Sequence, residues 1–230
     1  MTHDTDAIII GAGAVGLACA YALVQRGFET IVLEKEKAIG QGVSSRNSEV
    51  IHGGLYYPSG SLKARLCVEG RRKLYDFLAS HHVAHEMCGK LVVATEPDEV
   101  PRLKAILDQA ETNGVPGMRL ISGEEARELE PNLRAEAALI SPESGVMDSH
   151  GYMEALAGEL SARGGAIALN TPFAGAQKRP EGGFTVRTGG DQATEVSTRY
   201  LVIAAGLGAQ AAAAMITDYP GQLIPKLHYG

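Results

Sequence analysis

The feature that most limits the fold of this sequence is a Gly-x-Gly-x-x-Gly pattern that begins at Gly11. The residues before it, 7–10, form a short apolar run of the kind found in strands buried on both faces. After it, apolar residues recur at helical spacing over 15–25, and Gly27 marks the end of that helix. A second apolar run follows at 30–34. The order strand, glycine turn, helix, strand predicts a βαβ unit with two parallel strands.

In this setting the three glycines have separate expected roles. Gly11 makes the tight turn, Gly13 lets the backbone approach a pyrophosphate, and Gly16 lets the helix pack on the strand. The phosphates of a dinucleotide would then lie at the helix N-terminus, where free N–H groups favour anions. Glu34 ends the second predicted strand, about 20 residues further on, where an acidic side chain binds ribose hydroxyls. Its charge would repel a 2′-phosphate, so NADP is disfavoured.

A second glycine-rich segment follows at 44–57, inside a stretch too long to be a simple connection, which favours a binding loop. Ser44 or Ser45 can cap a helix that begins near Arg46 and ends at Gly53-Gly54. That helix start would be another anion-binding terminus, with the Arg46 guanidinium as an added phosphate donor.

The remainder of the chain alternates helices and strands, which predicts an α/β fold with a parallel sheet. A middle section over about 91–146 has its own strand and helices and is expected to form either a second layer or an inserted substrate region. The helices are predicted at 62–79, 98–113, 124–129, 152–163 and 209–215, and the strands at 90–94, 166–169, 173–178, 184–188 and 200–204.

Composition and charge exclude several classes of protein. Lys and Arg total 21 against 27 Asp and Glu, so no basic surplus exists for binding nucleic acid. Three cysteines without a C-x-x-C pair argue against a disulfide scaffold or a zinc finger, and no other metal site is expected. The sequence has no Gly-x-Ser-x-Gly motif, so hydrolysis by a serine nucleophile is not supported. The N-terminus is acidic and no apolar run spans a bilayer, so we expect no transmembrane segment and a cytoplasmic location, with peripheral membrane attachment left open.

These residues carry a resemblance to a known family. The opening βαβ unit, the 44–57 segment, residues 61–68 and residues 88–92 resemble the D-amino-acid-oxidase-type FAD-dependent oxidoreductases, especially the L-2-hydroxyglutarate dehydrogenase/oxidase branch. The most specific part is His-Gly-Gly-Leu-Tyr-Tyr, which starts at His52. The resemblance implies a flavoprotein with a Rossmann-like FAD-binding parallel sheet and an incomplete mixed-sheet substrate domain. The two domains are expected to comprise 1–90 with 147–215 and 91–146 with 216–230, respectively.

The resemblance also implies FAD as the cofactor and a set of residues that hold it. The Ala-Gly pair at the end of the predicted strand 200–204 matches a later family motif that lies against the dinucleotide. The expected FAD contacts are Gly11, Gly13, Gly16, Glu34, Lys35, Ser44, Ser45, Arg46, Asn47, Gly53, Gly54, Phe173, Ala205 and Gly206.

The implied reaction is oxidation of a small 2-hydroxy acid, with L-2-hydroxyglutarate preferred, to the 2-oxo acid by hydride transfer to the flavin. His52 is the expected base, because an unperturbed imidazole titrates near ~6.5. Tyr57 and Lys63 are expected to orient the small carboxylate substrate. Electrons would pass to a quinone or to oxygen.

Three alternatives stay open: an amine or amino-acid oxidase, a glycerol-3-phosphate dehydrogenase, and an inactive nucleotide-binding fragment. Members of the resembled family are longer than 230 residues. The chain is therefore expected to be a partial or truncated form that lacks the rest of the substrate sheet.

Overall fold

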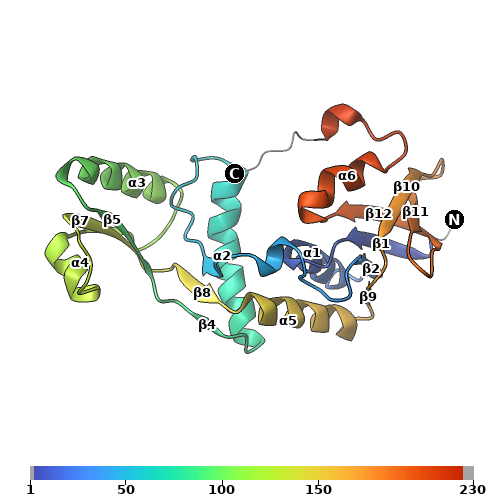
Figure 1. The fold of residues 1–230 in the computed structure, drawn as a ribbon, viewed down its shortest axis with the longest axis horizontal. Coiled ribbons are helices and arrows are strands. Elements are labelled where there is room, and N and C mark those ends of the chain that lie inside the picture. The colour runs from blue at the N-terminus through green and yellow to red at the C-terminus, as the bar shows by residue number, and fades with distance from the viewer. Residues whose placement is uncertain (1–2, 225–230) are drawn as a thin grey trace. The chain divides into compact units, whose positions relative to one another are not determined.

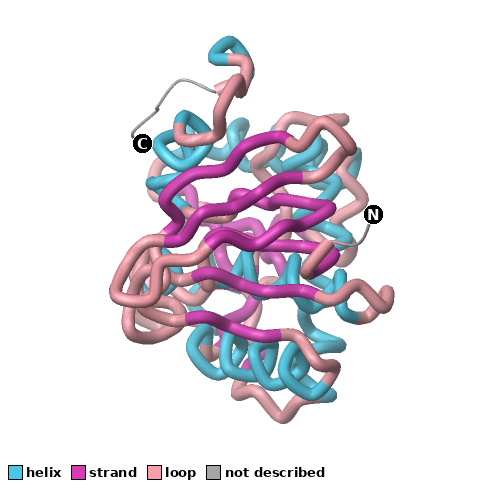
Figure 2. Tube along the Cα trace, turned by 90° about the vertical axis from the view of Figure 1, so that its right-hand side faces the viewer, coloured by secondary structure: helices cyan, strands magenta, loops and turns pink. Residues whose placement is uncertain are grey.

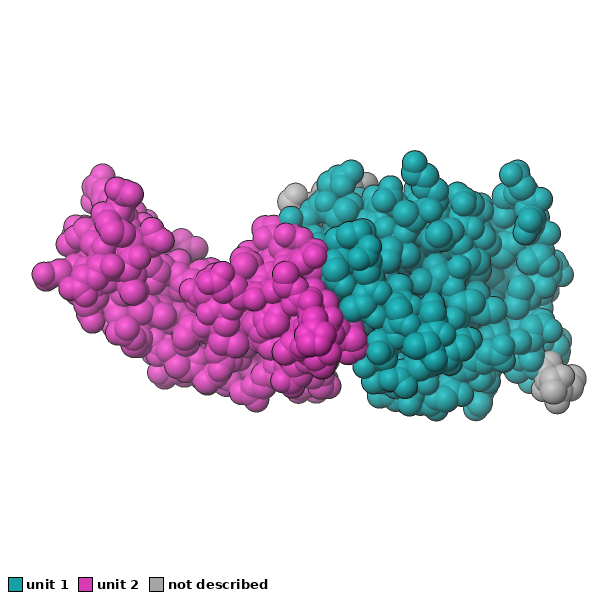
Figure 3. Space-filling view, turned by 90° about the horizontal axis from the view of Figure 1, so that it is seen from below, with its two compact units in different colours: residues 1–47, 149–230 teal, residues 48–148 magenta. Residues whose placement is uncertain are grey.

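The computed structural model describes residues 3–224, which fall into two compact units (Figure 3). Unit 1 comprises residues 1–47 and 149–230, and unit 2 comprises residues 48–148. Unit 1 contains a six-stranded sheet whose strands lie in the order β10-β11-β12-β1-β2-β9. Figure 2 shows these strands side by side. Their bounds are β1 Thr5–Ile10, β2 Thr30–Leu33, β9 Ala166–Ala168, β10 Phe173–Lys178, β11 Phe184–Thr188 and β12 Glu195–Ile203.

The predicted βαβ unit and its parallel sheet are confirmed. Strand β1 pairs in parallel with β2 and with β12, and β2 pairs in parallel with β9. Helix α1 (Ala14–Val24) connects β1 to β2, and helix α5 (Ser149–Ala162) leads into β9. The two helices pack against each other (Figure 1). Successive βα units thus bring the carboxyl ends of β1, β2 and β12 to one edge, where a doubly wound sheet binds its ligands.

The core of unit 1 explains why the first strand is continuously apolar. Ile8, Ile10 and Leu33 pack against Ala176 and Val186 of the β10–β11 hairpin. Ala7 and Ile9, which alternate with Ile8 and Ile10 along the strand, are also fully buried. Because side chains alternate between the faces of a sheet, β1 is covered on both faces.

The hairpin is confirmed, but β12 is longer than the predicted strand 200–204. Its first half pairs antiparallel with β11, and its second half pairs in parallel with β1. Residues 195–199 gave no continuous apolar signal because Val196 is the only apolar residue among them, and Glu195 and Arg199 are exposed.

The end of the described chain also belongs to unit 1. The 3₁₀ turn Gly206–Gly208, helix α6 (Ala209–Ala214) and the 3₁₀ turn Gly221–Leu223 follow β12. Ile216 forms a bridge with Ala176, and the Thr217 amide donates to the Ala176 carbonyl. Residues 216–224 of the expected substrate portion 216–230 are therefore grouped with the parallel sheet, and residues 225–230 lie outside the described part of the chain.

Unit 2 contains two small antiparallel sheets, with strand orders β3-β8-β4 and β5-β7-β6. Helix α3 packs on β5-β7-β6 through Leu103 against Leu139, and α4 packs through Ala126 against Ile121 and Ala138. The strands are β3 Val50–Ile51, β4 His85–Glu86, β5 Lys90–Ala94, β6 Arg119–Ser122, β7 Ala137–Ser141 and β8 Gly145–Met147. The helices are α2 Leu62–Ser80, the 3₁₀ turn Pro97–Glu99, α3 Val100–Thr112 and α4 Gly123–Leu129.

The first break between the units differs from the expected domain boundary. It follows Asn47 rather than residue 90, whereas the second break, after Asp148, lies close to the expected one after residue 146. The physical reason is that segment 48–90 makes its contacts within unit 2, through the pairing of β3 and β4 with β8. Which unit binds cofactor and which binds substrate stays a prediction. Within residues 3–224 no helix is long and apolar enough to cross a membrane.

Candidate functional site

The glycine turn of unit 1 is closely packed at two of its glycines. Gly11 has φ +104°, in the region that favours glycine, and a Cβ there would lie 2.6 Å from the Ala204 carbonyl oxygen. A Cβ on Gly16 would lie 1.9 Å from the Gly11 carbonyl oxygen. A side chain at Gly16 would push α1 away from the turn, and a side chain at Gly11 would collide with the backbone that follows β12.

The N-terminus of α1 receives its cap from a distant loop. Gly13 is the N-cap residue and has no side chain to offer, and the Ala14 amide donates instead to Ser44 Oγ at 3.0 Å. A Cβ on Gly13 would lie 2.8 Å from the same oxygen. Ser44 therefore lies directly against the helix end at which phosphates are expected to bind.

The prediction that a helix begins near Arg46 is wrong. Val43–Ser45 form one 3₁₀ turn that ends at Arg46, and Val50–Ile51 form strand β3 instead. The Ser44 hydroxyl that was expected to cap this helix caps α1. Glu49 has φ +58°, which a continuing right-handed helix does not allow. Tertiary contacts thus overrode the local capping signal.

Glu34 is held at the end of β2 beside the glycine turn. Its side chain is buried, Oε2 accepts from the Ala12 amide at 2.8 Å, and Oε1 accepts from the Glu36 amide at 3.0 Å. Each carboxylate oxygen can accept a second hydrogen bond. The group is therefore fixed in position and still able to bind a pair of hydroxyls. Lys35, the next residue, forms a surface ion pair with Glu36.

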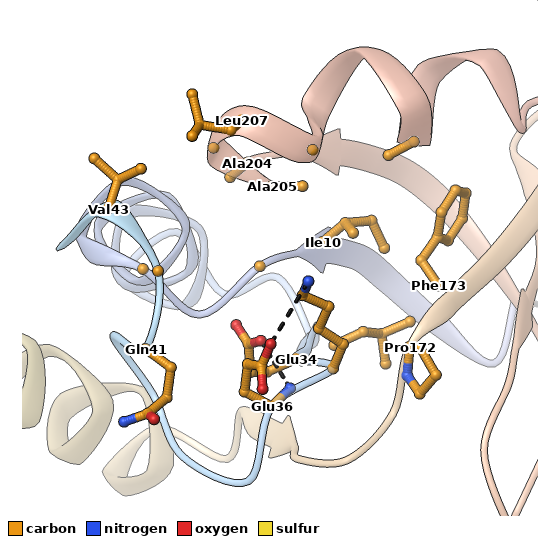
Figure 4. A pocket seen from close by; sticks show the side chains of 18 of the residues that line it. Ile10, Glu34, Glu36, Gln41, Val43, Pro172, Phe173, Ala204, Ala205 and Leu207 are labelled. Carbon is orange, nitrogen blue, oxygen red and sulfur yellow. Dashed lines mark hydrogen bonds and ion pairs between the residues drawn. The ribbon is translucent and has the colours of Figure 1, made fainter. Parts of the chain in front are cut away.

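A cavity of about 650 Å³ opens at this edge of the sheet. Figure 4 shows Val43 and Leu207 at one end, Pro172 and Phe173 at the other, and Ile10 between them. The expected cofactor residues that line it are Gly11, Gly13, Glu34, Lys35, Ser44, Arg46, Phe173, Ala205 and Gly206. Gly16, Ser45 and Asn47 belong to the same unit but are not part of the lining, and Gly53 and Gly54 belong to unit 2.

The chemistry of the lining fits a dinucleotide. A helix N-terminus and Arg46 offer donors for phosphates, Glu34 offers acceptors for ribose, and apolar side chains supply flat walls. The volume is in the range of small-molecule sites. Sequence reasoning missed the wall residues Gln41, Val43, Pro172, Leu207 and Met215, because single residues in connecting segments carry no motif.

In unit 2, side chains of two helices hold the backbone of the segment 53–57. Arg71 of α2 donates from Nη1 to the Gly53 carbonyl at 2.6 Å and pairs through Nη2 with Glu143. Asn113, at the end of α3, donates to the Tyr57 carbonyl at 2.9 Å. The Arg71 side chain is almost fully buried, so this contact is shielded from solvent. The segment after His52 is thus anchored.

His52 is exposed and lies in a positively charged environment. Partial burial lowers the pKa of its imidazole, and the charges of Lys90 and Lys63 lower that pKa further. The Cys67 thiol donates to the His52 carbonyl at 3.4 Å. An imidazole with a lowered pKa is neutral at pH 7 and can accept a proton.

Tyr57 and Lys63 lie together, and their role toward a substrate stays a prediction. The Lys63 Nζ lies 4.5 Å from the centre of the Tyr57 ring. Burial raises the pKa of the Tyr57 phenol, which is therefore protonated at neutral pH. Sequence reasoning missed Lys90, whose Nζ lies 4.6 Å from the centre of the Tyr56 ring, because nothing in the local sequence links strand β5 to His52.

Comparison with known proteins identifies the family. A sequence model described as FAD dependent oxidoreductase matches residues 6–229, which is nearly the whole chain. The chain belongs to the FAD-dependent oxidoreductase family. The recognised family and the predicted cofactor, FAD, are therefore confirmed.

Several relatives in this family share one name. Mitochondrial L-2-hydroxyglutarate dehydrogenases are 35% identical over 97% of the chain in Arabidopsis thaliana, 39% over 91% in Caenorhabditis elegans and 36% over 90% in Homo sapiens. These matches cover 52%, 49% and 47% of the respective relatives. The chain thus spans about half the length of the curated relatives it matches.

Solved structures confirm the fold class. L-alpha-glycerophosphate oxidase from Mycoplasma pneumoniae, solved with FAD bound, superimposes with a TM-score of 0.86 and 25% identity, covering 92% of this chain and 56% of its own. L-proline dehydrogenase from P. horikoshii gives a TM-score of 0.82 at 24% identity, covering 94% and 56%. The second likeness concerns the fold alone.

Proposed function

We propose that the protein oxidises L-2-hydroxyglutarate to the corresponding 2-oxo acid with FAD as its redox cofactor. The observation that carries this proposal is the cluster in unit 2, where a neutral imidazole lies in the field of two ammonium groups. A base and a receptor for carboxylate are what the oxidation of a hydroxy acid requires. Relatives at 35–39% identity bear the name of this activity.

We assign the FAD contacts to the cavity of unit 1. Bound FAD supplies the two-electron acceptor, and the protein positions it. Glu34 would bind the hydroxyls of the adenosine ribose through the oxygens that its backbone contacts leave available. Gly13 and the α1 N-terminus, with Arg46, would receive the pyrophosphate. Gly16 contributes by packing rather than by contact, and contacts from Ser45, Asn47, Gly53 and Gly54 stay predictions.

We assign proton abstraction to His52. Its neutral ring would take the proton of the substrate hydroxyl as hydride leaves the adjacent carbon, and the bond electrons of O–H would form the new carbonyl. The anchored backbone at Gly53 limits how far this ring can move. Tyr57 and Lys63 would orient the substrate, the lysine through its charge and the tyrosine through its protonated hydroxyl.

Other parts of the interpretation rest on sequence alone. A quinone or oxygen is proposed as the electron acceptor, nucleic acid is not an expected partner, and a cytoplasmic location, with or without peripheral membrane attachment, stays a prediction. No feature of the described structure favours an amine or amino-acid oxidase over the 2-hydroxy acid reaction.

Anaerobic reduction of the flavin tests the proposed activity. The purified yellow protein is mixed with L-2-hydroxyglutarate, D-2-hydroxyglutarate, glycerol 3-phosphate, glycine or L-proline, and the flavin absorbance is followed. We expect bleaching by L-2-hydroxyglutarate and at least about tenfold slower bleaching by its D enantiomer, because one base must reach one face of the carbon. Bleaching only by an amine or by glycerol 3-phosphate would contradict the proposal.

A further inference from the structure

Two lysines from distant parts of unit 2 place their ammonium groups over the rings of two consecutive tyrosines. Lys63 lies in the first turn of α2, and Lys90 is the first residue of β5. Each ammonium group lies over an aromatic ring, Lys63 over Tyr57 and Lys90 over Tyr56. Cation–π contacts of this kind restrict where a lysine head group lies. The two ammonium groups are therefore held over the rings of Tyr56 and Tyr57, in the segment that follows His52.

The ammonium groups of Lys63 and Lys90, which we call the lysine pair, have no acidic side chain as a partner. In the described part of the chain neither ammonium group is within ion-pair distance of a carboxylate. Glu143, which approaches the same segment, is paired with Arg71. Both lysines nevertheless act on the same two groups, His52 and Cys67. Two uncompensated positive charges around one imidazole form a site for an anion.

The number and type of the cationic side chains indicate how many carboxylates the bound anion carries. An ammonium group is a compact point charge with three donors and binds a single carboxylate well, whereas bidentate recognition is the property of arginine. Two such groups on separate elements match a ligand that carries two separate carboxylates. Lys63 also lies at the α2 N-terminus, whose partial positive charge adds to the field.

We propose that the lysine pair is a receptor for the two carboxylates of a dicarboxylic substrate and that Lys90 is a specificity-determining residue. Dicarboxylic 2-hydroxy acids would be selected over monocarboxylic ones because a single carboxylate leaves one ammonium group unpaired. The proposal rests on the proposed function for the identity of the reaction, but not for the binding of a dianion.

Binding of unreactive acids to the holoprotein tests the lysine pair. Calorimetry with glutarate and butyrate compares two carboxylates with one on similar carbon chains. We expect glutarate to bind at least about tenfold more tightly, and Lys90→Met and Lys63→Met each to remove most of that advantage while butyrate binding changes less. Lys90→Arg, which keeps the charge and the ring contact, should retain a large part of it. Lys104→Met, an exposed lysine of α3, is the matched control and should change neither affinity.

The outcomes separate this inference from the proposed activity. Equal affinities for glutarate and butyrate, or a glutarate affinity unchanged in both methionine variants, overturn the lysine pair even if L-2-hydroxyglutarate bleaches the flavin. Lysine-dependent glutarate binding without bleaching by any 2-hydroxy acid supports the receptor and overturns the activity. Glycerol 3-phosphate that binds more tightly than glutarate, and loses affinity in the same variants, overturns the dicarboxylate assignment.

Discussion

The proposed cofactor contacts come mainly from single side chains at the edge of the parallel sheet. Glu34 could be proposed as a ribose ligand from the sequence alone, because an acidic residue about 20 positions beyond a glycine turn matches the dinucleotide-binding pattern. The structure adds that two backbone amides orient it before any ligand arrives. Such preorganisation reduces the entropy lost on binding.

Replacing Glu34 by Gln tests its role toward ribose. The substitution keeps the size and removes the charge, so we expect the affinity of the apoprotein for FAD to fall by roughly 1–3 kcal/mol, the scale of one charge-assisted hydrogen bond. Quenching of flavin fluorescence during reconstitution measures the affinity. Glu36→Gln is the control, because Glu36 lies next to the same cavity and pairs with Lys35. An unchanged affinity in Glu34→Gln would remove this residue from the ribose site.

The pH dependence of flavin reduction reports on His52. A base acts in its deprotonated form, so the rate should rise with pH through the pKa of His52 and then level off. Burial, Lys90 and Lys63 lower that pKa, so the midpoint should lie below the ordinary value of about 6.5. Added salt screens the lysines and should move the midpoint upward. Stopped-flow reduction over pH 5–8 measures it, and a midpoint above 7 that ignores salt would contradict this environment.

At the scale of elements, the sequence predicted those whose signal is local. The βαβ unit, helix α2 (Leu62–Ser80) and the hairpin from Phe173 to Thr188 follow from apolar periodicity and glycine placement. The predicted helix at Arg46 failed because Ser44 bonds to α1, a contact between residues 30 positions apart. Strands β6, β7 and β8 escaped notice because they are short, and their pairing is what makes them strands.

The packing of α1 on the glycine turn can be tested with two alanine substitutions. Gly16→Ala places a Cβ 1.9 Å from the Gly11 carbonyl oxygen, so α1 must move and the melting temperature should fall by several degrees. Gly158→Ala in α5 meets nothing within 4 Å and should stabilise by about 0.5–1 kcal/mol, because alanine favours a helix. Thermal melts of both apoproteins, followed by circular dichroism, make the comparison. A melting temperature of Gly16→Ala equal to that of the unsubstituted protein would show that the turn accommodates the added methyl group without loss of stability.

At the scale of the whole molecule, the division into two units leads us to expect that cofactor binding is separable from the rest of the chain. Every residue that lines the cavity belongs to unit 1. The two ends at which unit 2 is inserted are close in space, since Asn47 Nδ2 donates to Ser149 Oγ at 3.5 Å. The fold class could be predicted from the sequence, whereas the first boundary could not, because it depends on which strands pair with β8.

A chain in which a short Gly-Ser linker replaces residues 48–148 tests this separation. We expect it to fold, with far-UV circular dichroism typical of an α/β protein, and to bind FAD in a manner that Glu34→Gln weakens. Affinity should be lower than in the full chain if Gly53 and Gly54 contribute contacts. A folded but colourless chain, to which added FAD does not bind, would show that the cavity of unit 1 is insufficient.

The central claim, that His52 is the base in the oxidation of a 2-hydroxy acid, is tested most directly by His52→Gln in the flavin-loaded protein. The account predicts normal FAD content, an unchanged melting temperature, retained binding of the 2-oxo acid, and reduction by L-2-hydroxyglutarate slowed roughly 10²–10⁴-fold. His82→Gln, an exposed histidine beyond the end of α2, serves as the control and should reduce at the normal rate. Single-turnover reduction under anaerobic conditions measures both. Near-normal reduction in His52→Gln would contradict the claim and move the search for the base to other groups.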